Sequence, residues 1–340
     1  MVGEFVRPPL AADGKRIFVA TRDGALRGLD PATGGVDWKN DSVPGTIAAT
    51  DGVLLARDET GVVRSVHPRT GVVRWSVETG IAGTLPAVID GERAYVAGDG
   101  LACLDAATGR VLWTDRSGPG VTAPPLRAGG RLLTGEKDGA LRSRDPETGR
   151  VTWSLATGRA LEAPPLVDEA RGKAYLGTTD RRILEVDLSR GHRGWRWKVG
   201  ADIVDHGALL PRGIAFAAFD AVLYGLRRGG NLDWRAALPS RPLSGPIRVG
   251  DFIVVACLEN EIVVLAPDTG KRLGVFRTTA EIRTPPLVLG GRVVLGLRDR
   301  SVVAYIPAGV EPGPPAPAVE PPAPPPTAEP AAVEPRAPGR

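Results

Sequence analysis

The sequence predicts an all-β protein, an eight-bladed β-propeller of four-stranded antiparallel blades. A tryptophan returns every 37 to 42 residues, each time four positions after a glycine. Self-similarity at this period indicates a repeat architecture. No stretch between Val2 and Pro307 has the apolar spacing of three and four that a helix needs, so the repeats are sheets. The tryptophans are Trp38, Trp75, Trp113, Trp153, Trp195 and Trp234, and their glycines are Gly34, Gly71, Gly109, Gly149, Gly191 and Gly230.

The third repeat, residues 84–115, shows why each unit should have four strands. It is broken at Asp90-Gly91, Asp99-Gly100 and Thr108-Gly109, and such dipeptides supply the positive φ that tight hairpins require. Four short strands in a repeat of about forty residues are typical of a propeller blade. The strands are expected at Leu85–Ile89, Ala94–Ala97, Leu101–Leu104 and Val111–Trp113.

The last two repeats depart from the pattern. Gly270 and Gly309 continue the glycine series to eight units, but Gly274 stands where the seventh tryptophan is expected. The eighth unit, residues 284–305, gives three strands and then runs into prolines, so its outer strand is missing. Many propellers close by letting the opposite terminus complete the last blade. Residues 2–7 are the only candidate donor, but aligning Arg7-Pro8-Pro9-Leu10 with Ala123-Pro124-Pro125-Leu126 places that segment mainly in a connecting loop. We therefore expect a weakly closed ring, or a chain that begins later than its natural gene product.

The sequence therefore predicts two segments, a propeller over residues 1–306 and a tail over residues 307–340. Thirteen of the 34 tail residues are proline, and alanine and scattered glutamates fill most of the rest. Proline removes backbone donors and large apolar side chains are nearly absent, so the tail is expected to be a disordered, extended arm. It is a candidate spacer or a ligand for a proline-binding domain. The propeller itself is expected to be monomeric.

Charge does not point to a nucleic-acid partner. The formal net charge is +4, and the tail contributes −2 from four glutamates and two arginines, which leaves +6 on residues 1–306. Those basic residues are spread over hairpins of different blades rather than gathered in one run. We expect them to be solvated edges that discourage pairing with other strands.

Cysteines and apolar runs give little indication of the compartment. Cys103 and Cys257 fall in blades three and seven, so we expect both to be free and buried, without a disulfide framework. No signal peptide, lipid-accepting cysteine or membrane-spanning apolar run is visible. The missing closing strand suggests that an upstream export signal has been lost with it.

Several repeats carry a recognisable motif. The stretch from Cys103 to Trp113, Cys-Leu-Asp-Ala-Ala-Thr-Gly-Arg-Val-Leu-Trp, resembles the Ala-x-Asp-x-x-Thr-Gly-x-x-x-Trp motif of the PQQ-like (pyrroloquinoline-quinone-like) propeller repeat family. Blades one and four repeat it from Asp30 and from Asp145, and blade two has His67 in place of the aspartate. Blade five has Arg190 before its glycine, and blade six is one residue shorter. The resemblance covers residues 8 to 306.

In physical terms the motif is scaffolding. Thr-Gly makes the turn between the third and outer strands, and the aspartate can accept hydrogen bonds from that turn. The tryptophan buries a wide, flat surface between blades. A row of indoles could also be read as a cofactor stack, but in this family such tryptophans lie near the outside of the ring.

The resemblance implies either an enzyme or a scaffold. Quinone-dependent dehydrogenases of the family carry an adjacent cysteine pair, calcium ligands, a catalytic aspartate and long inserted loops, and this chain has no Cys-Cys and only compact blades. Other members are non-enzymatic lipoprotein scaffolds of the outer-membrane β-barrel assembly machinery, and a third class serves as ligand-sensing or docking modules. We expect no catalytic residues, cofactor or metal site, a protein partner, and a place in the periplasm or cell envelope, with the cytoplasm as the alternative.

One group of polar residues is a candidate binding site. The positions that lead into the innermost strands align as Val6, Gly45, Thr84, Thr122, Glu162, Asp205, Leu243 and Arg283, and should ring one mouth of the central channel. Glu162, Asp205, His206 and Arg283 are the charged or titratable members of this ring. They could bind a small polar or peptide ligand, or simply be hydrated and paired with one another. His67 and His192 lie in motif turns and are expected to be solvated, so the three histidines do not form a metal site.

Overall fold

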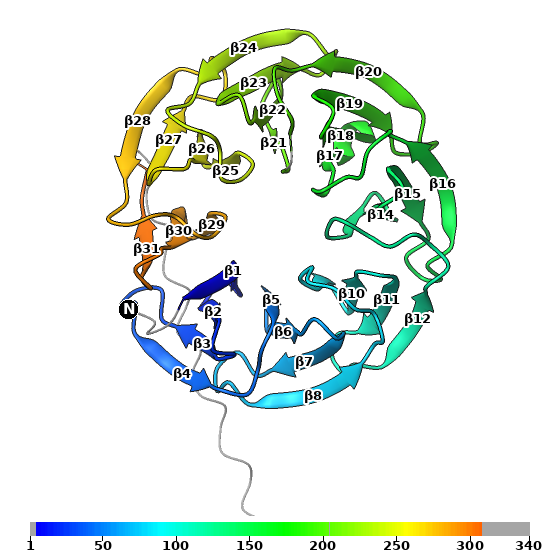
Figure 1. Ribbon diagram of the computed structural model, residues 1–340, viewed down its shortest axis with the longest axis vertical. Coiled ribbons are helices and arrows are strands. Elements are labelled where there is room, and N and C mark those ends of the chain that lie inside the picture. The colour runs from blue at the N-terminus through cyan, green and yellow to red at the C-terminus, as the bar shows by residue number, and fades with distance from the viewer. Residues whose placement is uncertain (1–4, 204, 308–340) are drawn as a thin grey trace, which may run out of the picture.

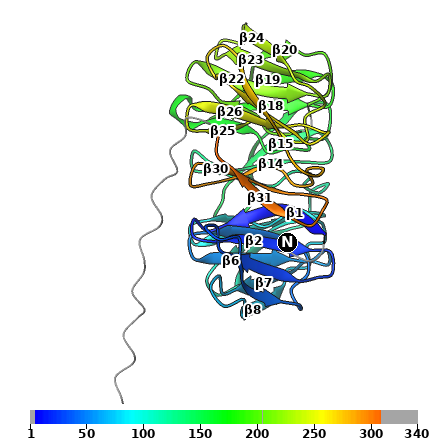
Figure 2. The same ribbon diagram turned by 90° about the vertical axis from the view of Figure 1, so that its left-hand side faces the viewer.

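The computed structural model describes residues 5–203 and 205–307, and it confirms the all-β fold. Eight antiparallel sheets surround a central axis, and seven of them have four strands while the last has three. Figure 1 shows the ring down its axis, and Figure 2 shows that it is a disc seen from the side. In every sheet the strand nearest the axis comes first in the chain and the rim strand comes last.

The first four blades are regular meanders. Blade one has β1 (Val6–Ala12), β2 (Ile17–Thr21), β3 (Leu26–Leu29) and β4 (Val36–Asn40). Blade two has β5 (Thr46–Thr50), β6 (Val53–Arg57), β7 (Val62–Val66) and β8 (Val73–Glu78). Blade three has β9 (Val88–Asp90), β10 (Arg93–Ala97), β11 (Leu101–Asp105) and β12 (Val111–Asp115). Blade four has β13 (Leu126–Ala128), β14 (Arg131–Gly135), β15 (Ala140–Arg144) and β16 (Val151–Ala156).

The remaining blades follow the same order. Blade five has β17 (Leu166–Asp168), a short 3-10 turn at Glu169–Arg171, β18 (Lys173–Thr178), β19 (Arg182–Asp187) and β20 (Arg193–Lys198). Blade six has β21 (Ala208–Leu209), β22 (Gly213–Ala218), β23 (Val222–Arg227) and β24 (Leu232–Ala237). Blade seven has β25 (Ile247–Val249), β26 (Phe252–Ala256), β27 (Glu261–Leu265) and β28 (Arg272–Arg277). Blade eight has β29 (Leu287–Leu289), β30 (Arg292–Gly296) and β31 (Val302–Tyr305).

Burial explains which apolar runs become which strands. The second and third strands of blades one to seven are mostly buried, because both of their faces pack against neighbouring blades. The third strand of blade eight, β31, is half-buried to exposed. The rim strands alternate between half-buried and exposed residues, as expected of a sheet edge at the surface. The core is therefore a series of clusters between adjacent blades, such as the one that joins Phe18 and Leu26 of blade one to Ile47 and Leu54 of blade two.

Two of the sequence predictions concern the first and last strands of the ring. The three strands expected for the eighth unit are confirmed, and within residues 5–203 and 205–307 no strand pairs with the outer edge of β31. The expectation that residues 2–7 lie mainly in a connecting loop is wrong for Val6 and Arg7, because β1 begins at Val6 and pairs with β2 despite a register irregularity between Arg7 and Ala11. Residues 2–4 lie outside the described residues. The irregularity absorbs the two prolines, which cannot donate to the ladder. The predicted tail from residue 308 onward lies outside the described residues.

The motif turns have the predicted chemistry. Asp105 Oδ1 accepts hydrogen bonds from the backbone N–H groups of Ala107 and Thr108 and from the Thr108 hydroxyl. The corresponding aspartates of blades one, four and five make the same kind of turn, and His67 Nδ1 accepts from Arg69 N in blade two. Both cysteines are free and buried, as predicted.

The tryptophans join each blade to the next. Trp113 Nε1 donates to the carbonyl of Pro146, 3.0 Å away, and its ring covers Gly149, the motif glycine of blade four. A Cβ at Gly149 would lie 2.7 Å from ring atoms of Trp113, closer than van der Waals contact allows. The same bond from indole N–H to backbone carbonyl joins Trp38 to Pro68, Trp75 to Ala107, Trp153 to Leu188 and Trp195 to Arg228. The ring of Trp234 covers Gly270 in the same way as Trp113 covers Gly149. We call this arrangement the indole–glycine contact.

The indole–glycine contact predicts different costs for two otherwise matched substitutions. Gly149 and Gly34 end the same turn, Asp-Pro-x-Thr-Gly, with φ of +72° and +71°, but nothing lies within 4 Å of a Cβ at Gly34. Gly34→Ala should cost about 1 kcal/mol of unfolding free energy, because only the left-handed backbone opposes it. Gly149→Ala should cost about 2 kcal/mol more, because it also displaces the indole.

Chemical denaturation of both variants and of the parent protein measures this difference. Equal losses of stability would mean that the indole does not hold the blades together at this junction.

Candidate functional site

The two faces of the ring are built from different segments. The loops that lead into each innermost strand lie on the same face as the hairpins that join second and third strands, because these segments bond to each other. Thr157 N donates to the carbonyl of Gly139, and Leu258 N donates to that of Arg241. We call this side the hairpin face. Its hairpins span residues 22–25, 58–61, 98–100, 136–139, 179–181, 219–221, 257–260 and 297–301.

The predicted mouth residues lie in loops of the hairpin face, but only two of them interact. Asp205 Oδ1 accepts from His206 N at 2.7 Å and lies 2.7 Å from His206 Nδ1. Asp205 Oδ2 accepts from Gly245 N at 2.8 Å, which ties the loop entering blade six to the loop entering blade seven. The Asp205 and His206 side chains keep 32% and 36% of their surface exposed. This pair is therefore an interblade tie that solvent can still reach.

The other two predicted residues are placed differently. Arg283 Nη2 pairs with Glu281 Oε2 at 3.0 Å, and the same carboxylate pairs with Arg298 at 3.1 Å, all within blade eight. Glu162 is exposed in the loop entering blade five. Among the described residues, neither Glu162 nor Arg283 forms an ion pair or hydrogen bond with Asp205 or His206. The structure therefore joins two of the four predicted residues and leaves the others to separate contacts.

The electrostatics of the Asp205–His206 pair favour its charged form. Burial alone would raise the pKa of the Asp205 carboxyl, but hydrogen bonds from His206 and the Gly245 amide outweigh it, so that pKa lies below its usual value. Burial lowers the pKa of His206, and the Asp205 carboxylate raises it by more, so the imidazole pKa lies above its ordinary 6.5.

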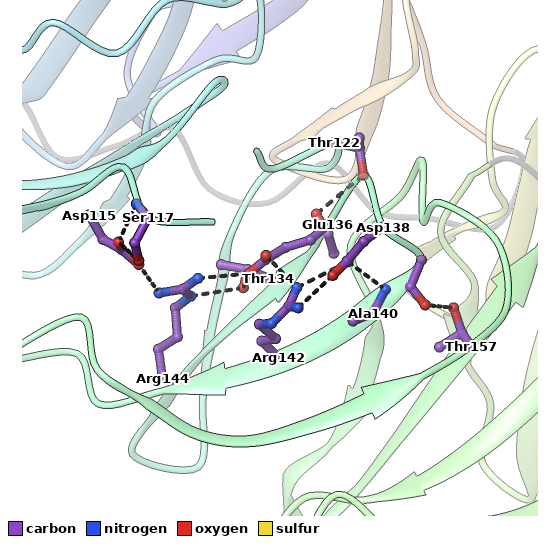
Figure 3. Close-up of polar contacts among 12 residues, drawn as sticks. Asp115, Ser117, Thr122, Thr134, Glu136, Asp138, Ala140, Arg142, Arg144 and Thr157 are labelled. Carbon is purple, nitrogen blue, oxygen red and sulfur yellow. Dashed lines mark hydrogen bonds and ion pairs between the residues drawn. The ribbon is translucent and has the colours of Figure 1, made fainter. Parts of the chain in front are cut away.

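A buried charge network in blade four was missed by the sequence reading. Glu136, with its side chain 1% exposed, binds the guanidinium groups of both Arg142 and Arg144. Arg142 also pairs with Asp138, and Arg144 reaches Asp115 of blade three at 2.6 Å (Figure 3). Three carboxylates thus face the two arginines. The Thr134 hydroxyl donates to Glu136 and accepts from Arg144. Only the fold brings these residues together, since the sequence shows them simply as charges on a hairpin.

Non-glycine residues with positive φ gather in one part of the hairpin face. They are Arg181, Ala221, Glu259, Asn260 and Arg300, all in hairpins of blades five to eight. The hairpins of blades one, two and four place Gly24, Gly61 and Gly139 at the matching turn. Glycine is the residue that adopts this conformation without cost, so side chains there are retained at some expense of stability. The missing glycines are visible in the sequence, but their common location is not.

Two exposed apolar side chains lie in the same hairpins. Phe219, in blade six, is 38% exposed, and Leu258, in blade seven, is 40% exposed. The neighbouring loops hold the Asp205–His206 pair. The hairpin face of blades five to eight thus combines two exposed apolar side chains, positive-φ turn residues and a charged pair.

The described part of the chain holds no grouping of three or more His, Cys, Asp or Glu side chains suited to a metal ion. Within residues 5–203 and 205–307 no helix is long and apolar enough to cross a membrane.

Comparison with known proteins identifies the family. The family model described as outer membrane protein assembly factor BamB matches residues 3–100, 59–204 and 217–307, which together span nearly the whole ring. The chain belongs to the BamB family. The aspartate turns and the indole–glycine contacts described above are thus features of a BamB-family propeller, as the PQQ-like repeat motif predicted.

One curated BamB can be aligned over part of its length. The outer membrane protein assembly factor BamB of Burkholderia pseudomallei (strain K96243) is 26% identical over 138 residues, which are 40% of this chain and 35% of that protein. The matched stretch thus spans about a third of that relative.

Solved structures support the fold. BamB from Moraxella catarrhalis has a TM-score of 0.75 at 20% identity, with 91% of this chain and 96% of that chain covered. The computationally designed protein Ika8 has a TM-score of 0.77 at 16% identity, over 87% and 95% of the two chains. The quinohemoprotein alcohol dehydrogenase of Comamonas testosteroni is more distant, with a TM-score of 0.66 at 11% identity, over 86% and 71%. At these identities each likeness concerns the fold alone.

The Asp205–His206 pair predicts a pH dependence of a defined sign. Because the folded pKa of His206 lies above that of the unfolded chain and the folded pKa of Asp205 lies below it, the pair stabilises the protein fully between about pH 3.9 and about pH 6.5. The contribution is lost as pH rises through the folded His206 pKa or falls through the folded Asp205 pKa. Asp205→Asn should therefore destabilise the protein more at pH 6 than at pH 8.5, and should lower the His206 pKa. Proton NMR titration of the imidazole measures the pKa directly.

His67 provides an internal control for that titration. Burial and the nearby Arg74 and Arg69 hold its pKa below the ordinary value, and Asp205→Asn should leave it unchanged. A His206 pKa that did not move in Asp205→Asn would contradict the assigned pairing.

The blade-four network predicts a second stability difference. Glu136→Gln keeps the shape of the side chain but leaves two arginines without their buried carboxylate, so it should cost about 3 kcal/mol. Asp138→Asn, at a carboxylate 38% exposed, should cost less than about 1 kcal/mol. Urea denaturation compares the two, and equal costs would mean that burial does not govern this network.

Proposed function

We propose that this protein is a non-catalytic protein-binding scaffold that acts in outer-membrane protein assembly in the cell envelope. The observation that carries the proposal is the match of the BamB family model to nearly the whole ring. The compactness of the blades supports it, because the strands are joined by short turns and no inserted loop is present that could enclose a cofactor in the described part of the chain.

The hairpin face of blades five to eight is the proposed contact surface. Phe219 and Leu258 supply exposed apolar area at neighbouring hairpins, and Asp205, His206 and Arg283 supply charged or polar groups beside them. An apolar centre with a polar surround is the usual composition of a protein interface. The opposite face consists largely of motif turns whose polar groups are already satisfied by the turn itself.

A quinone-dependent oxidoreductase is the less favoured function. The family's dehydrogenases carry an adjacent cysteine pair, whereas Cys103 and Cys257 lie in blades three and seven and are both buried. Burial raises the pKa of Cys257 to about 12 and also raises that of Cys103, which makes both thiols poor nucleophiles at neutral pH.

An affinity pull-down from the source organism, with bound proteins identified by mass spectrometry, tests the proposal. The full chain and a version ending at Ile306 should both recover outer-membrane assembly proteins. Phe219→Ser combined with Leu258→Ser should lose most of that recovery. The matched control is Val36→Ser with Val151→Ser, which changes side chains of similar exposure, 49% and 46%, on rim strands.

Two further outcomes test the position of the contact surface and the assembly role. If Asp205→Ala with Arg283→Ala left partner recovery unchanged, the channel mouth would not be part of the contact surface. Recovery of cytoplasmic proteins alone, or of partners that vanish with the tail, would contradict the assembly role.

A further inference from the structure

The outward side of the rim strand is apolar in blade seven. Side chains alternate along a strand, so the residues on either side of each indole position point away from the next blade. In blades one to six these pairs are Asp37 and Lys39, Arg74 and Ser76, Leu112 and Thr114, Thr152 and Ser154, Gly194 and Arg196, and Asp233 and Arg235. In blade seven they are Leu273 and Val275, which are 51% and 40% exposed. Of the seven fourth strands that the structure describes, only β28 carries two aliphatic residues there.

A groove with a volume of about 460 Å³ lies over these two side chains. Its walls come from β28, from the start of β27 and from the loop that follows β24, and they include Arg272, Leu273, Val275, Arg277, Glu261 and Pro239. We call it the blade-seven groove. Figure 1 shows β24 and β28 as neighbours on the rim, and Pro239 lies in the chain between them, so the groove faces blade six. The opposite side of β28 faces blade eight, where Phe276 contacts Tyr305.

The charges that line the groove leave one arginine uncompensated. Glu261 Oε1 accepts hydrogen bonds from Arg277 Nε and Nη2, at 3.2 and 3.1 Å. In the part of the chain that the structure describes, the Arg272 guanidinium forms neither an ion pair nor a hydrogen bond. Arg272 directly precedes Leu273 and is itself exposed. The groove therefore joins an apolar floor to a positive charge at one end.

This shape and charge fit an extended, acidic polypeptide. Leu273 and Val275 are about 7 Å apart along their strand, and any extended segment repeats the side chains of one face at that spacing. A carboxylate beside two such apolar side chains would meet Arg272, whose planar guanidinium can donate two parallel hydrogen bonds to it. A bilayer surface fits less well, because apolar groups must reach past the headgroups to bind it, whereas these side chains line a groove.

We propose that the blade-seven groove binds an extended, acidic segment of a partner protein. The segment places two apolar side chains, two residues apart, over Leu273 and Val275, and a neighbouring carboxylate pairs with Arg272. The aliphatic contacts supply affinity, and the ion pair selects for an acidic partner. The inference rests on the proposed function as a protein-binding scaffold, and it names a second contact surface together with the chemistry that this surface recognises.

The probe for this groove is the peptide Glu-Leu-Thr-Leu-Glu, blocked at both ends. It has a carboxylate at each end, so it can lie in either direction along β28. Added to the full 340-residue protein, it should shift the methyl NMR signals of Leu273 and Val275 in a saturable manner. The peptides Lys-Leu-Thr-Leu-Lys and Glu-Ser-Thr-Ser-Glu test charge and apolar contact separately, and each should bind on the order of tenfold more weakly.

Charge reversal at Arg272 tests the ion pair. Arg272→Glu should weaken binding of the glutamate peptide and strengthen binding of the lysine peptide, each on the order of tenfold. Arg196→Glu is the matched control, because it makes the same change of net charge at an exposed arginine of the blade-five rim. It should alter neither affinity. Equal affinity of the parent protein for the two charged peptides, or a preference that Arg272→Glu leaves unchanged, would overturn the proposal.

A serine pair tests the apolar floor. Leu273→Ser combined with Val275→Ser should abolish binding of the glutamate peptide. Val36→Ser with Val151→Ser is again the control, since these side chains are 49% and 46% exposed on the rims of blades one and four. If both pairs bound the peptide equally well, or if the parent protein showed no saturable shift, the groove would not be a peptide site.

Other occupants give different results, each of which would overturn the proposal. A dimer that Leu273→Ser with Val275→Ser dissociates would place a second copy in the groove. Tighter peptide binding to a chain ending at Pro307 would place the tail there. Binding to phosphatidylglycerol vesicles that the same serine pair abolishes would assign the groove to a membrane surface.

The peptide assay and the pull-down can fail separately. Absence of peptide binding, while Phe219→Ser with Leu258→Ser still removes assembly proteins from the pull-down, would overturn this inference alone. Peptide binding at the groove without any recovery of assembly proteins would overturn the assembly role and leave the groove as a peptide site.

Discussion

The contact between a tryptophan of one blade and the motif glycine of the next is the constraint on which the ring depends. The indole is wide and flat, and it can lie on the neighbouring turn only if that turn presents a glycine. Its N–H then donates a hydrogen bond to a carbonyl of the same turn. One side chain therefore fixes both the distance and the angle between blades. Repetition of this contact sets the curvature that brings the eighth blade back to the first.

The positions where the contact is absent mark the place where the ring closes. Gly274 removes the indole from blade seven, and the eighth blade ends at its third strand in the described part of the chain. Apolar packing still joins the ends, since Val6, Leu10 and Val19 of blade one form a cluster with Val294 of blade eight, against which Val302 packs. Among the described residues, this junction is thus held by packing between the inner strands.

The repeated contacts that hold the blades together and the residues that differ between blades lie on different parts of the molecule. The motif-turn face and the rim are built from repeated contacts that vary little from blade to blade. The hairpin face carries the irregular residues, and the blades there differ: blade four holds a buried charge network, while blades five to eight show positive-φ side chains and exposed apolar groups. A hairpin at the end of two buried strands can change its sequence without disturbing the core. This makes the hairpin face the natural place for contacts that are specific to one protein.

The sequence by itself determined the fold class, the number of blades, the three strands of the eighth blade and the chemistry of the motif turns. It could do so because these features follow from short-range patterns that recur in phase, such as Asp105 two to three residues before the amides it binds. It did not reveal that β1 begins at Val6, because Pro8 and Pro9 cannot donate to a ladder and therefore argue against a strand. Only the tertiary structure decided which charged residues meet. Asp205 binds the amide of Gly245, forty residues away, whereas Arg283 pairs with Glu281 within blade eight. The partner of a charge depends on how neighbouring blades are rotated against each other, and that rotation is set by packing between blades rather than by any local pattern.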